Sequence, residues 1–199
     1  MNILIVNTAF DYADYIAVTD DKKYAFKTDS NARHSETSLV YIDKALGECG
    51  IGINDVDVIA VNLGPGSFTG IRIGVGLVKG FASANSKFKL IGFNSFEPLI
   101  SRLNNDGNIY IETGKADYYF AKVVGGEICE MGSCQSIDES EPFVVFNDSE
   151  DASYKENELV NMVNKRIANA KFNELSQLEP VYLKLSQAEQ ELLSKSKNI

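Results

Sequence analysis

The most constraining feature of this sequence is a glycine-rich segment at residues 64–77, which joins a predicted buried strand at 56–62 to a predicted helix at 67–84. Four glycines lie inside that helix, namely Gly70, Gly74, Gly76 and Gly80. Each costs about 0.8–1 kcal/mol relative to alanine, so packing must offset roughly 3–4 kcal/mol. The other helix positions are apolar nearly all round, which indicates cover on more than one side. Either the helix packs tightly within its own fold, or a second face meets a partner subunit.

The rest of the sequence predicts two successive α/β units. The β-branched run at 3–6 is typical of a buried central strand, and apolar residues at spacings of three and four predict a helix at 35–49. The pattern β-β-β-α-β-α-β begins again past Ser101, which predicts a duplicated fold, and the polar tail after Ser186 is expected to fray. The remaining expected elements are strands at 15–19, 24–28, 90–93, 109–111, 119–124, 127–129 and 143–146, and a helix at 156–170.

The loop before the second helix is a candidate phosphate-facing loop. Gly64, Gly66 and Ser67 lie between a strand and a helix, where free backbone N–H groups can bind an anion. The known phosphate motifs do not match, because Gly70 is followed by Ile71-Arg72 rather than Lys-Ser/Thr, and the third position of a dinucleotide fingerprint is Thr69. The loop is therefore a candidate without an established motif.

Few residues are available for catalysis. The run His34-Ser35-Glu36 invites a hydrolase hypothesis, but triad groups converge in space rather than along the chain, and Ser35 as a helix N-cap is the plainer interpretation. Asn7 ends the first strand, and an amide cannot replace a carboxylate at Mg²⁺. One histidine and three cysteines without a CxxC pair make no plausible metal site. The sequence thus favours a protein without catalytic or metal-binding residues.

Charge is concentrated in one part of the chain. The 199 residues carry a net charge of −9, and residues 130–158 hold nine acidic residues against one lysine. This stretch is either a solvated acidic face or a docking patch for a basic partner. A net negative charge predicts that the chain alone binds nucleic acid weakly. The start of the chain lacks a leader pattern and no apolar run is long enough to span a membrane, so a cytoplasmic location is expected.

Several blocks resemble one family. Residues 64–74, with the sequence GPGSFTGIRIG, are similar to the signature of the TsaB (YeaZ) family, and 180–183, PVYL, resemble its closing motif. Where most relatives have Asp-Thr at the end of the first strand, this chain has Asn7-Thr8. The other blocks that resemble the family are Arg33-His34-Ser35-Glu36 before the first helix and the pattern Glu112, Lys115, Asp117 and Tyr119.

The resemblance implies an α/β fold of the actin-like (ASKHA, ribonuclease H-like) class with duplicated β-β-β-α-β-α domains, at 1–101 and 102–199. It also implies a non-catalytic subunit that dimerises with the TsaD transferase, which forms N6-threonylcarbamoyladenosine at position 37 of tRNA. A TsaE-like ATPase is the expected third partner, and tRNA is contacted only through the complex. No cofactor is expected on the isolated chain, while a nucleotide at the partner interface and a homodimer of the free chain both stay open.

The partner interface is expected on the helices at 35–49 and 67–84. Its predicted contacts are Leu39, Ile42, Arg72, Gly74, Val75 and Val78. Two alternatives remain. The first is an ASKHA-type ATP-dependent kinase or a peptidase that acts on a partner, and the second is a self-associating structural homodimer without a role in tRNA modification. ATP turnover by the chain alone, and co-purification with a TsaD-like protein, distinguish the three.

Overall fold

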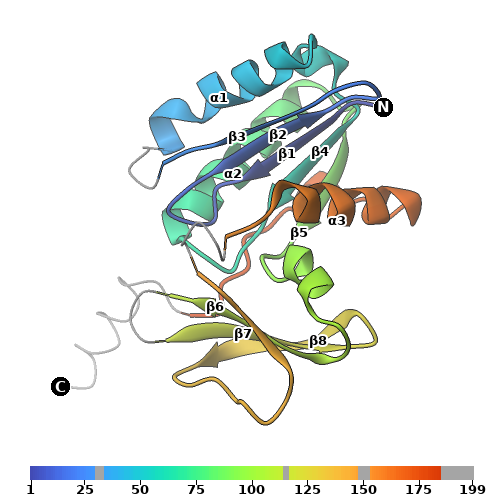
Figure 1. Ribbon diagram of the computed structural model, residues 1–199. Coiled ribbons are helices and arrows are strands. Elements are labelled where there is room, and N and C mark those ends of the chain that lie inside the picture. Colours follow the sequence, from blue (N-terminus) through green and yellow to red (C-terminus); the bar gives the residue numbers. More distant parts are fainter. Residues whose placement is uncertain (30–33, 114–116, 148–152, 185–199) are drawn as a thin grey trace, which may run out of the picture.

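The computed structural model describes residues 1–29, 34–113, 117–147 and 153–184. Arg33, Lys115 and the predicted tail after Ser186 lie outside these ranges. The chain forms two β-sheets, with two helices on the outer side of the first sheet and one helix between the sheets (Figure 1).

The first sheet has five strands in the order β3-β2-β1-β4-β5. β1 pairs antiparallel with β2 and parallel with β4, and all five β1 residues are buried. The apolar run Ile3–Val6 therefore forms the buried central strand that its composition predicts. The elements of this half are β1 (Ile3–Asn7), β2 (Asp14–Val18), β3 (Lys23–Lys27), α1 (His34–Glu48), η1 (Ile53–Asp55), β4 (Val58–Asn62), α2 (Phe68–Ala84), β5 (Lys89–Phe93) and η2 (Glu97–Arg102).

The second sheet has four strands in the order β8-β7-β6-β9. β6 pairs antiparallel with β7 and parallel with β9, as β1 does with β2 and β4. This repeated topology confirms the predicted duplication. No helix lies between β8 and β9, so the second repeat is shorter than the first. Its elements are β6 (Gly107–Glu112), β7 (Tyr118–Val124), β8 (Glu127–Cys134), β9 (Phe143–Phe146), α3 (Glu156–Ala168) and η3 (Leu175–Gln177).

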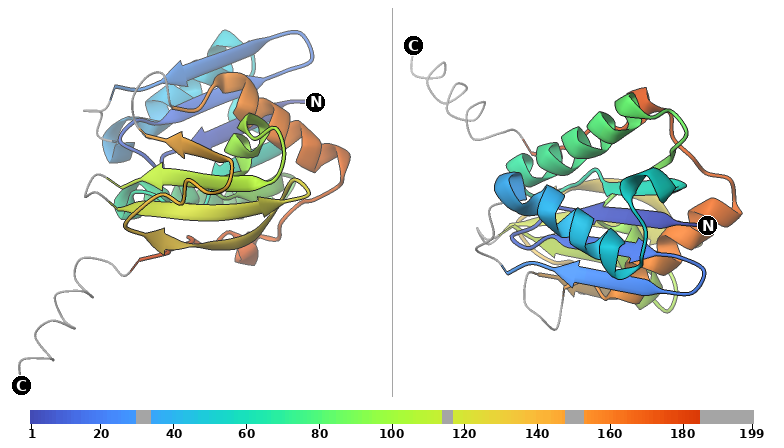
Figure 2. Two further views of the ribbon diagram at one scale, coloured as in Figure 1. Left: turned by 60° about the horizontal axis from the view of Figure 1, so that its bottom comes forward. Right: turned by 90° about the horizontal axis from the view of Figure 1, so that it is seen from above.

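The helices divide the molecule into layers. α1 packs on β2 and β3, and α2 packs on β4 and β1, on the same face of the first sheet (Figures 1 and 2). α3 and the second sheet lie on the other face, and the apolar sides of both sheets share one continuous core. No helix of the described residues is both long and apolar enough to cross a membrane.

Most predicted elements are confirmed to within about two residues. β8 is the largest difference, because it runs to Cys134 rather than ending at Cys129. Its poor strand formers are held by pairing with β7, where Tyr118 lies opposite Cys134. The domain boundary between residues 101 and 102 stays a prediction. Part of the second half returns to the first sheet, since Asn173 bridges to Leu90 and the Val181 N–H donates to the Leu63 carbonyl at 2.7 Å.

Candidate functional site

One glycine just before α2 and another in its first turn allow the helix to lie directly on the loop that follows β1. A Cβ at Gly66 would overlap the carbonyl oxygen of Ala9, and one at Gly70 would overlap the carbonyl oxygen of Thr8. The Thr8 hydroxyl donates to the Gly70 carbonyl at 2.7 Å, and this hydrogen bond holds the start of α2 against the β1–β2 loop. These glycines therefore serve packing within the chain, one of the two alternatives from the sequence.

The same packing corrects part of the phosphate prediction for Gly64, Gly66 and Ser67. The Gly64 N–H donates to Asn62 Oδ1 at 2.8 Å, and the Ser67 N–H donates to the Ala9 carbonyl at 2.7 Å. The Ser67 hydroxyl caps α2 by accepting from the Gly70 N–H at 3.2 Å. Because the protein itself satisfies the N–H groups of Gly64 and Ser67, these two donors are not free to bind a phosphate group, while the contribution of Gly66 stays a prediction.

Four of the six predicted interface residues are also corrected. Ile42, Val75 and Val78 are buried in the core, with Val75 only 4 % exposed. A Cβ at Gly74 would overlap the Thr8 hydroxyl. These four residues therefore pack within the chain, because α1 and α2 turn this side toward their own sheet. Leu39 and Arg72 lie on the exposed side of the helices, as an interface requires.

The outward side of α1 and α2 combines exposed apolar residues and glycines with the charged residues Glu36, Asp43, Lys44, Glu48 and Arg72. Leu39 is 56 % exposed and Val40 is 64 % exposed on α1. A Cβ at Gly47, Gly76 or Gly80 would meet open space, so these glycines do not serve internal packing. Because they carry no side chain, they leave the backbone of both helices accessible from outside. The two helices contact each other, and together they present one continuous face, which we call the helix face.

Arg72 joins the helix face to the C-terminal motif at 180–183. Its Nε donates to the Tyr182 hydroxyl at 2.9 Å, and its guanidinium lies 4.2 Å from the ring centre of Phe68. The Phe68 and Tyr182 rings are stacked with their centres 4.1 Å apart. This cluster holds the C-terminal segment against the start of α2.

The end of β1 carries a buried polar network instead of a metal-binding carboxylate. Asn7 donates from Nδ2 to Asp14 Oδ2 at 2.8 Å and accepts from Asn62 Nδ2 at 2.9 Å. Burial raises the pKa of the Asp14 carboxyl from 3.8 to about 6, while the Asn7 hydrogen bond and the charge of Lys27 lower it. The sequence gives no signal for this buried acid, because its burial depends on contacts from three separate strands and the second half.

Aromatic rings fill the space between the β1–β2 loop and the second half. The Phe10 ring centre lies 4.6 Å from that of Phe146 and 5.4 Å from that of Tyr154. All three side chains are buried, and burial raises the pKa of Tyr154 well above its usual value. Rings in contact leave no room for a nucleotide at this position, so the residues present do not fit one.

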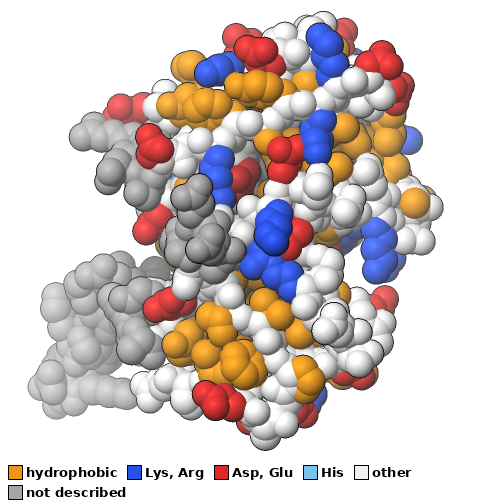
Figure 3. Space-filling model, viewed as in Figure 1, with side chains coloured by type: hydrophobic (Ala, Val, Ile, Leu, Met, Phe, Trp, Pro, Cys, Tyr) orange, Lys and Arg blue, Asp and Glu red, His pale blue; other side chains and the backbone are white. Residues whose placement is uncertain are grey.

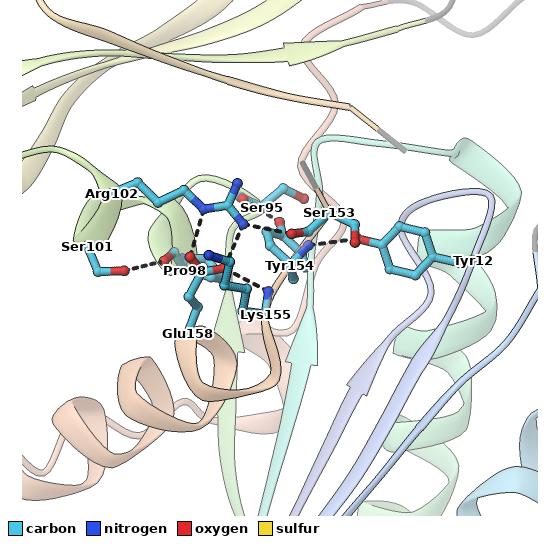
Figure 4. A network of polar contacts seen from close by, with 9 residues as sticks. All are labelled: Tyr12, Ser95, Pro98, Ser101, Arg102, Ser153, Tyr154, Lys155 and Glu158. Atoms are coloured by element: carbon cyan, nitrogen blue, oxygen red, sulfur yellow. Dashed lines mark hydrogen bonds and ion pairs between the residues drawn. The ribbon is translucent and has the colours of Figure 1, made fainter. Parts of the chain in front are cut away.

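A second polar network holds the two halves together (Figure 4). Arg102 of η2 makes a two-point ion pair with Glu158 of α3, at 2.7 and 2.8 Å, and donates to the Ser153 carbonyl at 2.7 Å. The Tyr154 hydroxyl donates to the carbonyl of Ser95. Both ion-pair partners are mostly buried, so the network resists separation of the two halves.

The hydrolase hypothesis for His34-Ser35-Glu36 gains no support. His34 Nε2 lies 3.2 Å from the Phe10 carbonyl, and its Nδ1 is buried without a partner among the described residues. Ser35 lies inside α1, which begins at His34, so its predicted role as N-cap is wrong. In those ranges no three His, Cys, Asp or Glu side chains form a group that could hold a metal ion.

Comparison with known proteins identifies the family. The family model of TsaD, tRNA N6-adenosine threonylcarbamoyltransferase, matches residues 28–141, more than half of the chain. The chain belongs to this family. It is 32 % identical over 82 residues to a tRNA threonylcarbamoyladenosine biosynthesis protein TsaB from Haemophilus influenzae, and 30 % identical over 95 residues to that of Escherichia coli. These matches cover 41 % and 48 % of this chain but only 35 % and 41 % of the two relatives.

The relatives include both TsaB and TsaD proteins. A tRNA N6-adenosine threonylcarbamoyltransferase from Cereibacter sphaeroides is 35 % identical over 100 residues, which are 49 % of this chain and 25 % of that protein. The structure of YeaZ from Pseudomonas aeruginosa matches with a TM-score of 0.72 at 18 % identity, over 92 % of this chain and 99 % of that one. The fold and the resemblance to the TsaB (YeaZ) family are thus confirmed.

Proposed function

We propose that this chain is a non-catalytic subunit in tRNA threonylcarbamoyladenosine biosynthesis, and that it binds a TsaD-like transferase through the helix face. The helix face carries the proposal, because the exposed Leu39 and Val40 form an apolar patch among charged residues, and the open glycines leave the helix backbone accessible beside it. An apolar surface of this kind is a typical protein–protein contact. Glycines on a helix surface let the helix of a partner approach closely, which larger side chains would prevent.

A partner of the same family is the natural occupant of this face. Relatives named TsaB and TsaD both match the chain, so a TsaD-like subunit shares the fold and has helices equivalent to α1 and α2. Two such pairs of helices can pack against each other about a pseudo-two-fold axis. The same geometry would allow a homodimer of the free chain, which then competes with the heterodimer. We further propose that a TsaE-like ATPase, tRNA and any nucleotide are bound by the cytoplasmic complex rather than by this chain alone.

Three observations support a non-catalytic role over a kinase or peptidase. Asn7 replaces the carboxylate that organises metal and phosphate, and Asn7 is committed to Asp14 and Asn62. The rings of Phe10 and Phe146 fill the space between the β1–β2 loop and β9. The chain has a single histidine, which rules out a pair of histidine ligands to a metal.

Binding to a TsaD-like subunit tests the proposal. Val40→Asp places a charge on the exposed part of α1, so the variant should fold normally but bind the TsaD-like subunit at least tenfold more weakly, with equal loss of tRNA modification in reconstitution. Val124→Asp is the matched control, because Val124 is similarly exposed, at 48 %, but lies on the second sheet. Calorimetry gives both affinities. Equal binding by the two variants would refute the assignment of the helix face, and ATP turnover by the chain alone would refute the non-catalytic role.

A further inference from the structure

The second sheet has an outer face that no helix covers. In the first repeat, α1 follows the third strand and covers β2 and β3. In the second repeat, the chain between β8 and β9 is a loop at 135–142. The left view of Figure 2 looks onto the outer side of β6 to β9, and no helix of the described residues lies in front of the strands. The loss of one helix from the duplicated unit therefore leaves a sheet face that only this loop crosses. The loop covers Tyr110, which is 4 % exposed and whose hydroxyl accepts from the Asp138 N–H at 3.0 Å, while Phe143 and the strand β7 stay open in part.

The outer face of the second sheet has an aromatic floor. Strand alternation places Tyr110, Tyr118 and Phe120 on it, together with Phe143 of the edge strand β9. The Tyr110 ring meets those of Tyr118 and Phe143 edge-on, with ring centres 6.1 and 6.3 Å away. Phe143 is 41 % exposed, and apolar side chains gather over this part of the molecule (Figure 3).

Acidic residues surround this floor. Glu112 and Glu130 point to the same side of the sheet, and Asp138, Glu139 and Glu141 lie on the loop that crosses it. Lys122 is the one cation on this side among the described strand residues, and it is already paired with Glu141 at 3.0 Å. A hollow of about 260 Å³ lies between Tyr110, Phe120 and the loop, with Asp138 and Glu141 at its edge. The face is therefore apolar in the middle and negative around it.

We propose that the outer face of the second sheet is a docking surface for a cationic segment of another protein, one that carries arginine or lysine beside apolar side chains. The aromatic floor takes the apolar groups, and arginine can stack on the partly exposed Phe120 while it pairs with Asp138 or Glu141, which line the same hollow. The acidic surround repels phosphate, which excludes RNA as the ligand. This surface lies on the opposite side of the molecule from the helix face and does not depend on the function proposed above.

Two other candidate occupants of this face, the C-terminal residues of the chain and a second copy of it, lack the required positive charge. Residues 185–199 of this chain hold two glutamates and two lysines, so they offer no net positive charge. A second copy would bring its own outer face against this one, which sets Glu130, Glu139 and Glu141 against identical carboxylates. Like charges in such a contact cost free energy rather than contribute it. Charge complementarity thus selects a separate, basic partner.

Two synthetic peptides test the proposal with the full chain. One is a dodecamer of alternating arginine and leucine, and the other has glutamate in place of arginine. The first peptide should bind with an affinity that falls as salt is raised from 50 to 200 mM, whereas the second should not bind. Amide NMR shifts should change in β6, β7 and β9 and stay unchanged in α1 and α2. The triple variant Asp138→Asn, Glu139→Gln, Glu141→Gln should bind about tenfold more weakly, and Phe143→Ser at least threefold more weakly.

Controls separate this surface from general attraction to an acidic protein. The triple variant Asp20→Asn, Asp21→Asn, Asp55→Asn removes the same charge near the first sheet and should keep wild-type affinity. Thermal melting checks that each variant is folded. Equal loss in both triple variants, or shifts centred on the helix face, would overturn the proposal. So would binding that appears only after truncation at Lys184, which would make the C-terminal residues the occupant, or a dimer that Phe143→Ser converts to a monomer, which would make a second copy the occupant.

Discussion

Replacing Gly70 and Gly76 with alanine, one at a time, should change the stability of this protein in opposite directions. Both glycines lie inside α2, and helix propensity alone predicts the same gain of about 0.8–1 kcal/mol for each change. Their surroundings differ. A Cβ at Gly70 overlaps the Thr8 carbonyl, whereas a Cβ at Gly76 meets open space.

The magnitudes follow from these contacts. At Gly70 the overlap is with backbone, so α2 or the β1–β2 loop must move, and overpacking of this kind costs about 1–3 kcal/mol. The hydrogen bonds from Thr8 Oγ1 to Gly70 and from the Ser67 N–H to Ala9, both 2.7 Å long, would lengthen, at a cost of about 1 kcal/mol each. After subtraction of the propensity gain, Gly70→Ala should destabilise the fold by about 2–4 kcal/mol. Gly76→Ala should stabilise it by about 1 kcal/mol.

Thermal and urea unfolding of the two variants measure this difference. For a chain of this size, 1 kcal/mol shifts the Tm by about 2–4 °C, so Gly76→Ala should melt a few degrees above the wild type. Gly70→Ala should melt roughly 5–15 °C below it. If both substitutions raise the Tm, α2 does not rest on the β1–β2 loop, and the packing argument for its inward glycines is refuted.

Three further predictions concern other parts of the fold. Val75→Asp should unfold the protein or lower its Tm sharply, because Val75 is a core residue, and a folded variant with lost partner binding would contradict its burial. The pKa of Asp14 is raised from 3.8 to about 6, so the folded state holds a proton that the unfolded state releases, and stability should fall by up to about 3 kcal/mol as pH rises from 4 to 6. Asp14→Asn should remove this dependence and be the more stable protein at pH 7.5 in urea titrations, while an unchanged pH profile would count against the buried carboxyl. Tyr182→Ala should lower stability by about 1–2 kcal/mol through loss of stacking on Phe68, and Tyr182→Phe should keep most of it in the same assay.

Much of the fold could be predicted from local pattern. The run Ile3–Val6 predicted a buried central strand, and apolar spacing predicted α1 to within about two residues. The glycine-rich loop after a strand predicted α2 with the same accuracy. The order of elements also predicted the duplication. β8 was underestimated because Glu130 and Gly132 are poor strand formers, and pairing with β7 up to Tyr118 opposite Cys134 extends the strand.

The faces of the helices could not be predicted in the same way. Gly74 and Gly76 are two positions apart in one apolar helix, yet one contacts Thr8 and the other faces open space. Nothing in local composition distinguishes them, because the difference depends on which side the sheet lies. The resemblance to the family predicted that α1 and α2 form the interface. However, Gly74, Val75 and Val78, which were predicted as contacts, lie on the inward side of α2. The aromatic filling between the halves was missed for the same reason, since Phe10 and Phe146 are far apart in the sequence.

Hydrogen–deuterium exchange on this chain, alone and with a TsaD-like subunit, tests the central claim most directly. The claim is that a transferase of the same family binds the helix face. Protection should therefore increase in residues 34–48 and 68–84 when the partner is added, and exchange in β6 to β9 should stay unchanged. Increased protection confined to residues 107–146, or no protection at a partner concentration that supports tRNA modification, would contradict it.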